Sequence, residues 1–332
     1  MHYKEKIKYH PKPEFIERMQ ALIGKEDADV FFKIAYEETP DSIRCNTLKI
    51  SPEELKQKLE SKNWKIHQPF SQFPEVIIVD SELGPGELGN TKEHLLGYYY
   101  VQEISSMLPI LALQPQPGEI LLDLCASPGS KTTQAAAMMQ NQGTIFANDL
   151  EMGRIAILGA NLEKCGVMNT IVTRKDAVQL CKLIEKKSNL KFDKILVDAP
   201  CSCEGTLRKS PKTFLMWNVK VIEKFSRVQK KIASSALKLL KVGGEMIYST
   251  CTLSPEEDEE VVDFLCKNFD IEIEKIDLPL KLRSGVCEWG RKVYDERIKN
   301  ACRVYPQDNN TDGFFLCKIK KLSDLCRIID YD

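Results

Sequence analysis

The chain has 332 residues, of which 43% are hydrophobic and 29% charged, and its 47 Lys and Arg residues nearly balance 48 Asp and Glu residues. This is an ordinary soluble composition, and the chain is long enough for two domains with a substantial core. No apolar run approaches the roughly 20 residues of a membrane-spanning helix, which excludes a membrane segment. The N-terminal segment carries Lys4, Lys6 and Lys8, followed by Pro11 and Pro13, and it lacks the apolar stretch of a signal peptide. We therefore expect a cytoplasmic protein whose twelve cysteines are reduced thiols.

The first hundred residues predict a small α+β domain. The pattern indicates two helices, a strand, a third helix and two short strands, over residues 13–22, 28–36, 42–50, 52–61, 64–67 and 76–79. A turn-rich segment at residues 82–89, with three glycines and a proline, closes it. We therefore place this domain at residues 1–100.

From residue 101 to residue 332 the pattern alternates between strand and helix, which predicts an α/β domain with a doubly wound, Rossmann-like sheet. A long helix is expected at residues 219–240. The predicted strands lie at residues 119–122, 144–148, 170–173, 194–197 and 245–248. Two last strands, at residues 271–276 and 313–319, are expected to pair antiparallel at the edge of the sheet.

The first of these strands runs into a turn of small residues and then into a helix expected at residues 133–139. Backbone N–H groups at such a helix start face a nucleotide-type ligand, although the turn matches neither the G-x-G-x-x-G loop nor the Walker loop. Asp123, Asp149 and Asp176 follow three successive strands. Each alone is more often a cap or turn residue, but together they indicate one adenosine-shaped ligand, with Asp149 on the ribose.

Two cysteines follow two of the later strands, in the segments D-A-P-C-S (residues 198–202) and S-T-C-T (residues 249–252). Because the carboxyl ends of parallel strands line the ligand crevice, Cys201 and Cys251 are expected to face substrate. A free cysteine is usually a small buried hydrophobe, but two thiols beside a ligand loop suit attack on an electron-poor carbon and release of the product. No C-x-x-C or H-x-x-x-H spacing occurs, so we expect no structural zinc site.

Residues 201–241 contain ten Lys or Arg against two Glu, and the compensating acid gathers at residues 256–260. Such a basic run is usually a solvated helix face. Because this one begins in the loop that carries Cys201, we interpret Arg208, Lys209 and Lys212 as phosphate contacts of a nucleic acid.

These motifs resemble those of the NSUN-type (Nop/Sun) RNA 5-methylcytosine methyltransferases, most of all the archaeal tRNA-methylating type. The likeness covers roughly residues 40–320. It rests on D-L-C-A-S-P-G-S-K-T (residues 123–132), the D-A-P-C-S and S-T-C-T turns, G-Y-Y-Y-V-Q-E-I-S-S-M (residues 97–107), Arg303, Pro306 and D-G-F-F (residues 312–315). The chain departs from the family pattern at Ser127, Ser130, Asp258, Gln307 and Cys203, the last of which stands where Gly is usual.

The resemblance implies an enzyme that uses S-adenosylmethionine. It implies that Cys251 attacks carbon 6 of cytosine and that Cys201 promotes breakdown of the adduct, although chemistry alone permits the opposite assignment. Asp198 is then expected to polarise N3 and N4 of the base, and Lys131 its carbonyl. The expected methyl-donor residues are Cys125, Ala126, Ser127, Pro128, Gly129, Ser130, Lys131, Asp149, Arg154, Asp176 and Asp198. Arg44 and Asn46 lie in a segment that resembles the RNA-facing strand of the family.

Two other classes of function stay open. An enzyme that methylates an exocyclic nitrogen typically carries an Asp/Asn-Pro-Pro-aromatic turn and needs no thiols, which the D-A-P-C segment disfavours. A non-catalytic RNA-binding assembly factor is disfavoured by the intact Lys131, Asp198, Cys201 and Cys251. For the substrate we predict tRNA first and rRNA second, because the chain is compact and lacks long charged tails. We expect a monomer that binds RNA and neither a metal ion nor a membrane.

Overall fold

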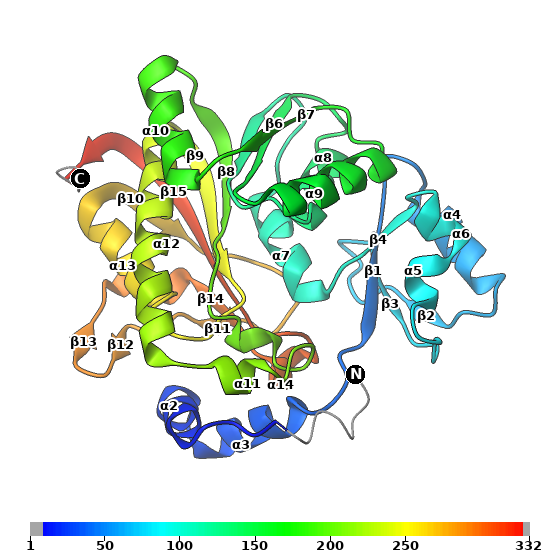
Figure 1. The fold of residues 1–332 in the computed structure, drawn as a ribbon, viewed down its shortest axis with the longest axis horizontal. Helices are drawn as coiled ribbons and strands as arrows, with labels where there is room; N and C mark the ends of the chain where they lie inside the picture. Colours follow the sequence, from blue (N-terminus) through cyan, green and yellow to red (C-terminus); the bar gives the residue numbers. More distant parts are fainter. Residues whose placement is uncertain (1–8, 328–332) are drawn as a thin grey trace. The chain divides into compact units, whose positions relative to one another are not determined.

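The computed structural model describes residues 9–327, so Lys4, Lys6 and Lys8 lie outside the described residues. The chain forms two compact units, each described here by itself (Figure 1). The middle unit comprises residues 40–196, and the terminal unit joins the chain up to residue 39 with the chain from residue 197 onward. Within residues 9–327, no helix combines the length and the apolar character that crossing a membrane requires.

The middle unit begins with a small antiparallel sheet in the order β2-β3-β1-β4. Helix α4 packs Leu55 and Leu59 into the same buried cluster as Ile43 and Ile77 of this sheet. A capping box of Ser51 and Glu54 fixes the start of α4. The elements are β1 (Asp41–Cys45), α4 (Pro52–Glu60), β2 (Ile66–His67), β3 (Val76–Val79), α5 (Glu87–Asn90), α6 (Lys92–Leu95) and β4 (Tyr99–Val101).

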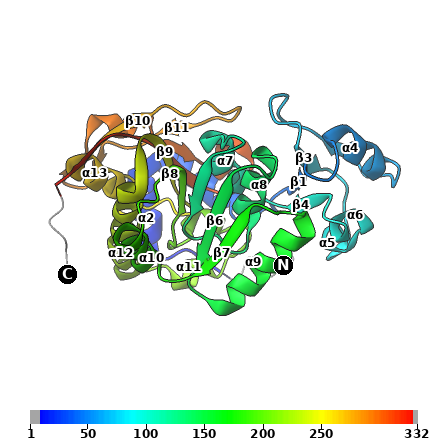
Figure 2. The ribbon, with the colours of Figure 1, turned by 90° about the horizontal axis from the view of Figure 1, so that it is seen from above.

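A parallel sheet follows in the same unit. β5 pairs with β6 and β8, and β6 pairs with β7, all in parallel register. Helix α9 packs against β6 and β7 (Figure 2). Because parallel strands end at one edge, the turns after β5, β6 and β7 gather there. The elements are α7 (Ile104–Leu113), β5 (Ile120–Asp123), α8 (Ser130–Met138), β6 (Thr144–Asp149), α9 (Met152–Cys165), β7 (Thr170–Arg174), α10 (Ala177–Lys187) and β8 (Phe192–Asp198).

The last two residues of β8 belong to the terminal unit, in which β15 makes only antiparallel pairs. β15 pairs with β9, β10 and β14, and α12 packs along β9 and β15 (Figure 1). The larger elements are α12 (Val219–Leu239), β9 (Leu240–Thr250), α13 (Glu259–Asn268), β10 (Phe269–Glu274), β14 (Cys302–Val304) and β15 (Phe314–Cys326). The short ones are η1 (Glu204–Thr206), α11 (Thr213–Met216), β11 (Arg283–Ser284), β12 (Glu288–Trp289), β13 (Lys292–Val293), η2 (Glu296–Asn300) and α14 (Pro306–Asn309).

The first two helices, α2 (Pro13–Ile23) and α3 (Lys25–Ile34), also belong to the terminal unit. Phe15 of α2 and Phe31 of α3 lie in a buried cluster with Phe214, Trp217 and Leu253. The domain predicted at residues 1–100 included both helices, whereas their aromatic side chains pack on segments more than 170 positions later in the chain.

The predicted α/β class, with a mostly parallel central sheet, is confirmed. The antiparallel pairing expected for residues 271–276 and 313–319 is also confirmed, because Ile273 of β10 lies opposite Ile319 of β15.

Candidate active site

A tight turn between β5 and α8 forms the predicted ligand loop. Asp123, the last residue of β5, accepts a hydrogen bond at Oδ2 from Thr132 Oγ1 at 2.7 Å. Gly129 has a φ of 103°, and a Cβ there would lie 2.9 Å from Leu158 Cδ1 of α9. Left-handed backbone and close packing therefore both favour glycine at this position.

Asp149, the last residue of β6, fastens this loop. Its carboxylate is nearly fully buried, and Oδ2 accepts a hydrogen bond from Ser127 N at 3.2 Å. Arg154 Nη2 lies 3.5 Å from the same oxygen and donates to Ser127 O at 2.7 Å. The structure thus brings together three of the predicted methyl-donor residues, Ser127, Asp149 and Arg154.

Asp176 and Asn148, near this loop, each make hydrogen bonds that stabilise the local backbone. Asp176 is exposed and caps α10, where its carboxylate accepts a hydrogen bond from Gln179 N at 3.0 Å. Asn148 was not singled out by the sequence analysis. Its Nδ2 donates to Leu124 O at 3.1 Å and to Lys175 O at 2.9 Å, so this amide ties together the turns that follow β5 and β7.

Two cationic side chains make hydrogen bonds at the start of α8, Lys131 from the helix itself and Arg44 from β1. Lys131 is buried and donates from Nζ to Ser106 Oγ of α7 at 3.1 Å. Arg44 of β1 donates from Nη1 to Ser130 O at 2.7 Å and from Nη2 to Thr133 Oγ1 at 2.9 Å. Because the Arg44 guanidinium is 1% exposed and hydrogen-bonded inside the unit, it positions the ligand helix and offers no surface to RNA.

Asn46 likewise faces inward. Its amide nitrogen donates to Gly97 O and to Cys165 O, both at 2.8 Å, and the side chain is 1% exposed. The expectation that Arg44 and Asn46 contact RNA is therefore corrected, because an amphipathic strand pattern does not reveal which polar side chains have partners within the protein.

The terminal unit places the two cysteines that were predicted to be catalytic side by side. The turn after β8 lies against the turn after β9, where Ala199 N donates to Ser249 O at 2.9 Å and Gly205 N donates to Cys251 O at 2.8 Å. Asp198 Oδ1 accepts a hydrogen bond from Ser249 Oγ at 2.8 Å. As a result, Cys201 Sγ lies 3.3 Å from Cys251 Sγ.

A third thiol, which the sequence analysis noted only as a departure from the family pattern, joins this pair. Cys203 Sγ lies 4.0 Å from Cys201 Sγ. Hydrogen bonds from Cys201 and then from Cys251 lower the pKa of Cys203, against the effect of burial. Hydrogen bonds with Cys203 and then with Cys251, and burial after them, raise the pKa of Cys201 well above its usual range. Of these two thiols, Cys203 therefore loses its proton more easily than Cys201.

Glycines bring the C-terminal strand against these loops. A Cβ at Gly205 would lie 2.1 Å from Gly313 O, and Gly313 N donates to Gly205 O at 2.8 Å. The two backbones therefore touch directly, which explains the glycine of the D-G-F-F segment.

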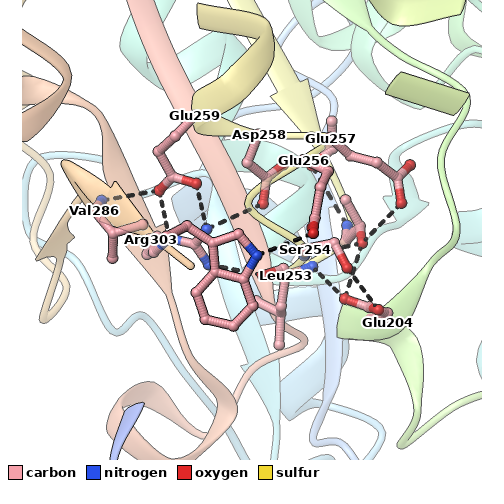
Figure 3. Close-up of polar contacts among 12 residues, drawn as sticks. Glu204, Leu253, Ser254, Glu256, Glu257, Asp258, Glu259, Val286 and Arg303 are labelled. Atoms are coloured by element: carbon pink, nitrogen blue, oxygen red, sulfur yellow. Dashed lines mark hydrogen bonds and ion pairs between the residues drawn. The ribbon is translucent and has the colours of Figure 1, made fainter. Parts of the chain in front are cut away.

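The acidic run at residues 256–260 lies mostly inside the protein, beside the thiol loops (Figure 3). Glu257 accepts hydrogen bonds from Ser202 N at 3.1 Å and from Gln229 Nε2 at 2.9 Å. Glu204 accepts from Ser254 Oγ at 2.8 Å and from Trp217 Nε1 at 2.6 Å. Each carboxylate therefore fixes one of the two loops that carry the thiols.

Arg303 is the buried cation that faces this run (Figure 3). Its Nε donates to Glu259 Oε1 at 2.6 Å, and its Nη1 donates to the carbonyl of Leu253 at 3.0 Å. Glu204, Glu257 and Glu259 were not predicted as positioning residues. The only sequence signal of Glu257 and Glu259 was an acidic cluster, which is ordinarily read as solvated, and Glu204 was one of two acidic residues in a basic stretch.

The basic stretch divides into buried and exposed members. Arg208 is 2% exposed and donates to Thr311 O at 3.3 Å and Asn310 Oδ1 at 2.8 Å, so its expected phosphate contact is corrected to an internal one. Lys212 is exposed, and Lys209 is half-exposed with its Nζ 3.1 Å from Asp312 Oδ2. Only these two of the three predicted residues offer charge to solvent.

A nucleotide-type ligand loop and a pair of thiols that follow strand ends are both typical features of methyltransferases that work through cysteine. Residues 110–320 match the family described as 16S rRNA methyltransferase RsmB/F, and residues 12–104 match the N-terminal domain of 16S rRNA methyltransferase RsmF. The chain therefore belongs to the RsmB/F methyltransferase family, and the resemblance noted from its motifs is confirmed.

Two relatives differ in how much of their own length is matched. The tRNA (cytosine(49)-C(5))-methyltransferase of Pyrococcus abyssi is 40% identical over 97% of this chain and 99% of its own length. The ribosomal RNA small subunit methyltransferase F of Vibrio cholerae is 38% identical over 86% of this chain, which spans 58% of that relative.

Two solved structures from Pyrococcus horikoshii share the fold. A methyltransferase homologue has a TM-score of 0.83 and 33% identity, covering 96% of this chain and 99% of the other. NSun6, crystallised with the S-adenosylmethionine analogue SFG, has a TM-score of 0.79 and 26% identity, covering 94% and 98%.

Burial of Glu257 predicts a pH-dependent stability. Burial raises the pKa of this carboxyl to about 7, so between its ordinary value of 4.5 and 7 the unfolded chain loses a proton that the folded chain keeps. Stability is therefore lost as pH rises through this window. Relative to Glu257→Gln, the wild type is expected to lose about 3 kcal/mol of unfolding free energy between pH 4.5 and 8, measured by urea unfolding.

Glu260→Gln provides the matched control. Burial acts to raise the pKa of Glu260, but Lys230 and Lys292 outweigh it and hold the pKa below its ordinary value. The difference between wild type and Glu260→Gln should accordingly stay flat between pH 5 and 8. A flat difference for Glu257→Gln as well would show that Glu257 is ionised in the folded protein throughout.

Proposed function

We propose that this protein is an S-adenosylmethionine-dependent RNA methyltransferase that modifies carbon 5 of a cytosine, with tRNA as its first substrate class. The observation that carries the proposal is the pair of thiols, Cys201 and Cys251, at 3.3 Å on the turns after β8 and β9. Membership of the RsmB/F family supports it.

The thiols answer a chemical difficulty. Carbon 5 of cytosine is too weak a nucleophile to accept a methyl group directly, so a thiolate first adds to carbon 6 and turns the ring into an enamine. We assign this attack to Cys251, whose thiol first gives up its proton to solvent. After carbon 5 has taken the methyl group, a water molecule accepts the carbon-5 proton, with Cys201 assisting this removal. The bond between Cys251 Sγ and carbon 6 then breaks and frees the product.

Two further side chains complete the proposed catalytic set. Asp198 would hydrogen-bond N3 and N4 of the base, and its Oδ1 is already oriented by Ser249 Oγ at 2.8 Å. Lys131 would donate to the cytosine carbonyl, in addition to its present hydrogen bond to Ser106 Oγ. Each such acid–base contact typically contributes about 10²–10⁴ in rate.

The loop after β5 fits a methyl donor by the polar groups that it presents. The hydroxyl of Ser127 is buried and has no hydrogen-bond partner among residues 9–327, and a ligand polar atom would satisfy it. Asp149 lies beside it and is proposed to accept from the ribose hydroxyls. When bound, S-adenosylmethionine supplies the methyl group as an activated sulfonium. Cys125, Ala126, Pro128, Gly129, Ser130 and Asp176 remain proposed members of this site.

The choice of tRNA over rRNA rests on similarity to the Pyrococcus abyssi tRNA enzyme. That enzyme is 40% identical over 97% of this chain, whereas the Vibrio cholerae rRNA enzyme is 38% identical over 86% of it. The target base must leave its stack before Cys251 can reach carbon 6, which favours loops and junctions of folded RNA. Twelve thiols, three of them clustered, suit the reducing cytoplasm, which we propose as the location.

A trapping experiment distinguishes the roles of the two thiols. Cys251→Ala is expected to lose both methylation and adduct formation, because no other thiolate is assigned to carbon 6. Cys201→Ala is expected to attack and then fail to release, which leaves a protein–RNA complex that survives a denaturing gel. Cys287→Ala, a half-buried thiol outside the cluster, serves as the control and should behave as wild type.

RNA that carries 5-azacytidine should trap the wild type, because nitrogen at position 5 has no proton to lose. Adducts that persist in Cys251→Ala and vanish in Cys201→Ala would show that the two roles are exchanged. Normal methylation without any adduct would reject covalent catalysis.

Asp149→Asn tests the methyl-donor site. The substitution keeps the size of the side chain and removes its charge, so S-adenosylmethionine affinity measured by calorimetry without RNA should fall about tenfold or more, as expected for one charge-assisted hydrogen bond. Asp80→Asn, at an exposed pair with His67, should leave the affinity unchanged. Equal affinities for wild type and Asp149→Asn would remove Asp149 from the site.

Lys209 and Lys212 are proposed to contact RNA phosphates. Replacing both by Gln should weaken RNA binding and reduce the slope of log affinity against log salt by about 1.5, since each phosphate contact contributes roughly 0.7–0.9. Methyl-donor affinity should stay constant. Replacing Lys186 and Lys187, on the last turn of α10, by Gln is the charge-matched control. A slope equal to that of the wild type would assign both lysines to an ordinary solvated face.

A further inference from the structure

Cys203 occupies a backbone position that suits glycine better than cysteine. Its φ is 62°, in the left-handed region that side chains rarely adopt. Because a strained backbone position is often found at a functional site, the presence of a cysteine here, next to two other thiols, suggests a role for its sulfur.

The three sulfurs lie at distances that suit one metal ion. Cys201 Sγ is 3.3 Å from Cys251 Sγ and 4.0 Å from Cys203 Sγ, and all three sulfurs lie within 4.8 Å of one another. Thiolates bound to a tetrahedral zinc ion at about 2.3 Å lie about 3.8 Å apart, so small side-chain rotations bring the observed set to this spacing. Among residues 9–327, these three cysteines form the group of metal-ligating side chains whose ligand atoms lie close enough together to share one ion.

The three cysteines come from two loops that are already tied together. Gly205 N donates to Cys251 O at 2.8 Å, and Ser202 Oγ lies 2.8 Å from Thr252 Oγ1. The ligands are therefore preorganised, and Cys203 and Cys251 are half-buried, so that an ion can reach the cluster from their side. Three sulfur ligands select soft or borderline cations such as Zn²⁺, Cd²⁺ and Cu⁺ over Mg²⁺ or Ca²⁺.

We propose that Cys201, Cys203 and Cys251 form a three-thiolate site for a thiophilic cation of the Zn²⁺ class, and that its occupancy switches off methyl transfer. Three S–H groups each lose a proton to solvent as three metal–sulfur bonds form, and a water molecule completes the tetrahedron. No oxidation is involved. The inhibition rests on the proposed function, because a metal-bound Cys251 sulfur cannot add to carbon 6. The metal site itself does not depend on that function.

Binding is tested on the full chain in metal-free buffer with a phosphine reductant, using Cd²⁺ as the probe. The wild type should bind one Cd²⁺ per chain, with the ultraviolet absorption of thiolate-to-metal charge transfer. Cys203→Gly suits the left-handed backbone and should bind Cd²⁺ at least tenfold more weakly, and Cys203→Ser should do the same. Cys287→Ser should match the wild type. Unchanged affinity in both Cys203 variants, or no charge-transfer band in the wild type, would overturn the site.

Inhibition is tested separately. Zn²⁺ should stop RNA methylation by the wild type, and a chelator should restore it. Cys203→Gly, scored against its own metal-free activity, should require at least tenfold more Zn²⁺ than the wild type for the same fractional inhibition. Wild-type activity that persists with Cd²⁺ or Zn²⁺ bound would overturn the switch. A chain that binds Cd²⁺ through Cys203 but never transfers a methyl group would reject the proposed function and leave the metal site in place.

Discussion

The loops that carry the two reactive thiols keep their shape because carboxylates are buried beside them. Glu204 and Glu257 accept hydrogen bonds from residues of both loops, and Arg303 holds the carbonyl of Leu253 while it pairs with Glu259. Charges inside a protein are costly unless each finds a partner, so these groups stay only where their hydrogen bonds are complete. The position of Cys251 relative to Cys201 is thus set by a network in which the removal of one member leaves another charge buried and unpaired.

In the middle unit, a buried cation that donates to a backbone carbonyl likewise fixes the position of the ligand loop. Arg44 reaches from the small antiparallel sheet to the first turn of α8, where its guanidinium donates to the carbonyl of Ser130. Asn46 joins the same sheet to the carbonyls of Gly97 and Cys165. The small sheet therefore serves the ligand loop as a support, and substitutions in it are expected to act on methyl-donor binding.

Much of this could be predicted from sequence, for physical reasons that are local. Strand patterns and small-residue turns located the ends of β5, β6 and β8, and a turn after a strand determines where Asp149 and Cys201 emerge. The burial of Arg44 and Arg208 was not predictable, because it depends on partners 80 or more positions away in the sequence. The burial of the acidic run at residues 256–260 was not predictable for the same reason, because its hydrogen-bond partners, such as Gln229 and Arg303, are distant in the sequence. Cys203 was visible as a departure from the family pattern, but only the fold shows that its sulfur meets two others.

The contact between Gly205 and Gly313 also affects how the protein is made. A chain that emerges from the ribosome in order exposes Cys201 and Cys251 long before residue 313 arrives to lie against Gly205. Until then the two loops lack one of the backbone surfaces that hold them. We therefore expect the pair of thiols to reach its final geometry only after residue 313 has been added. A partly synthesised chain is expected to be chemically inert towards the RNA around it.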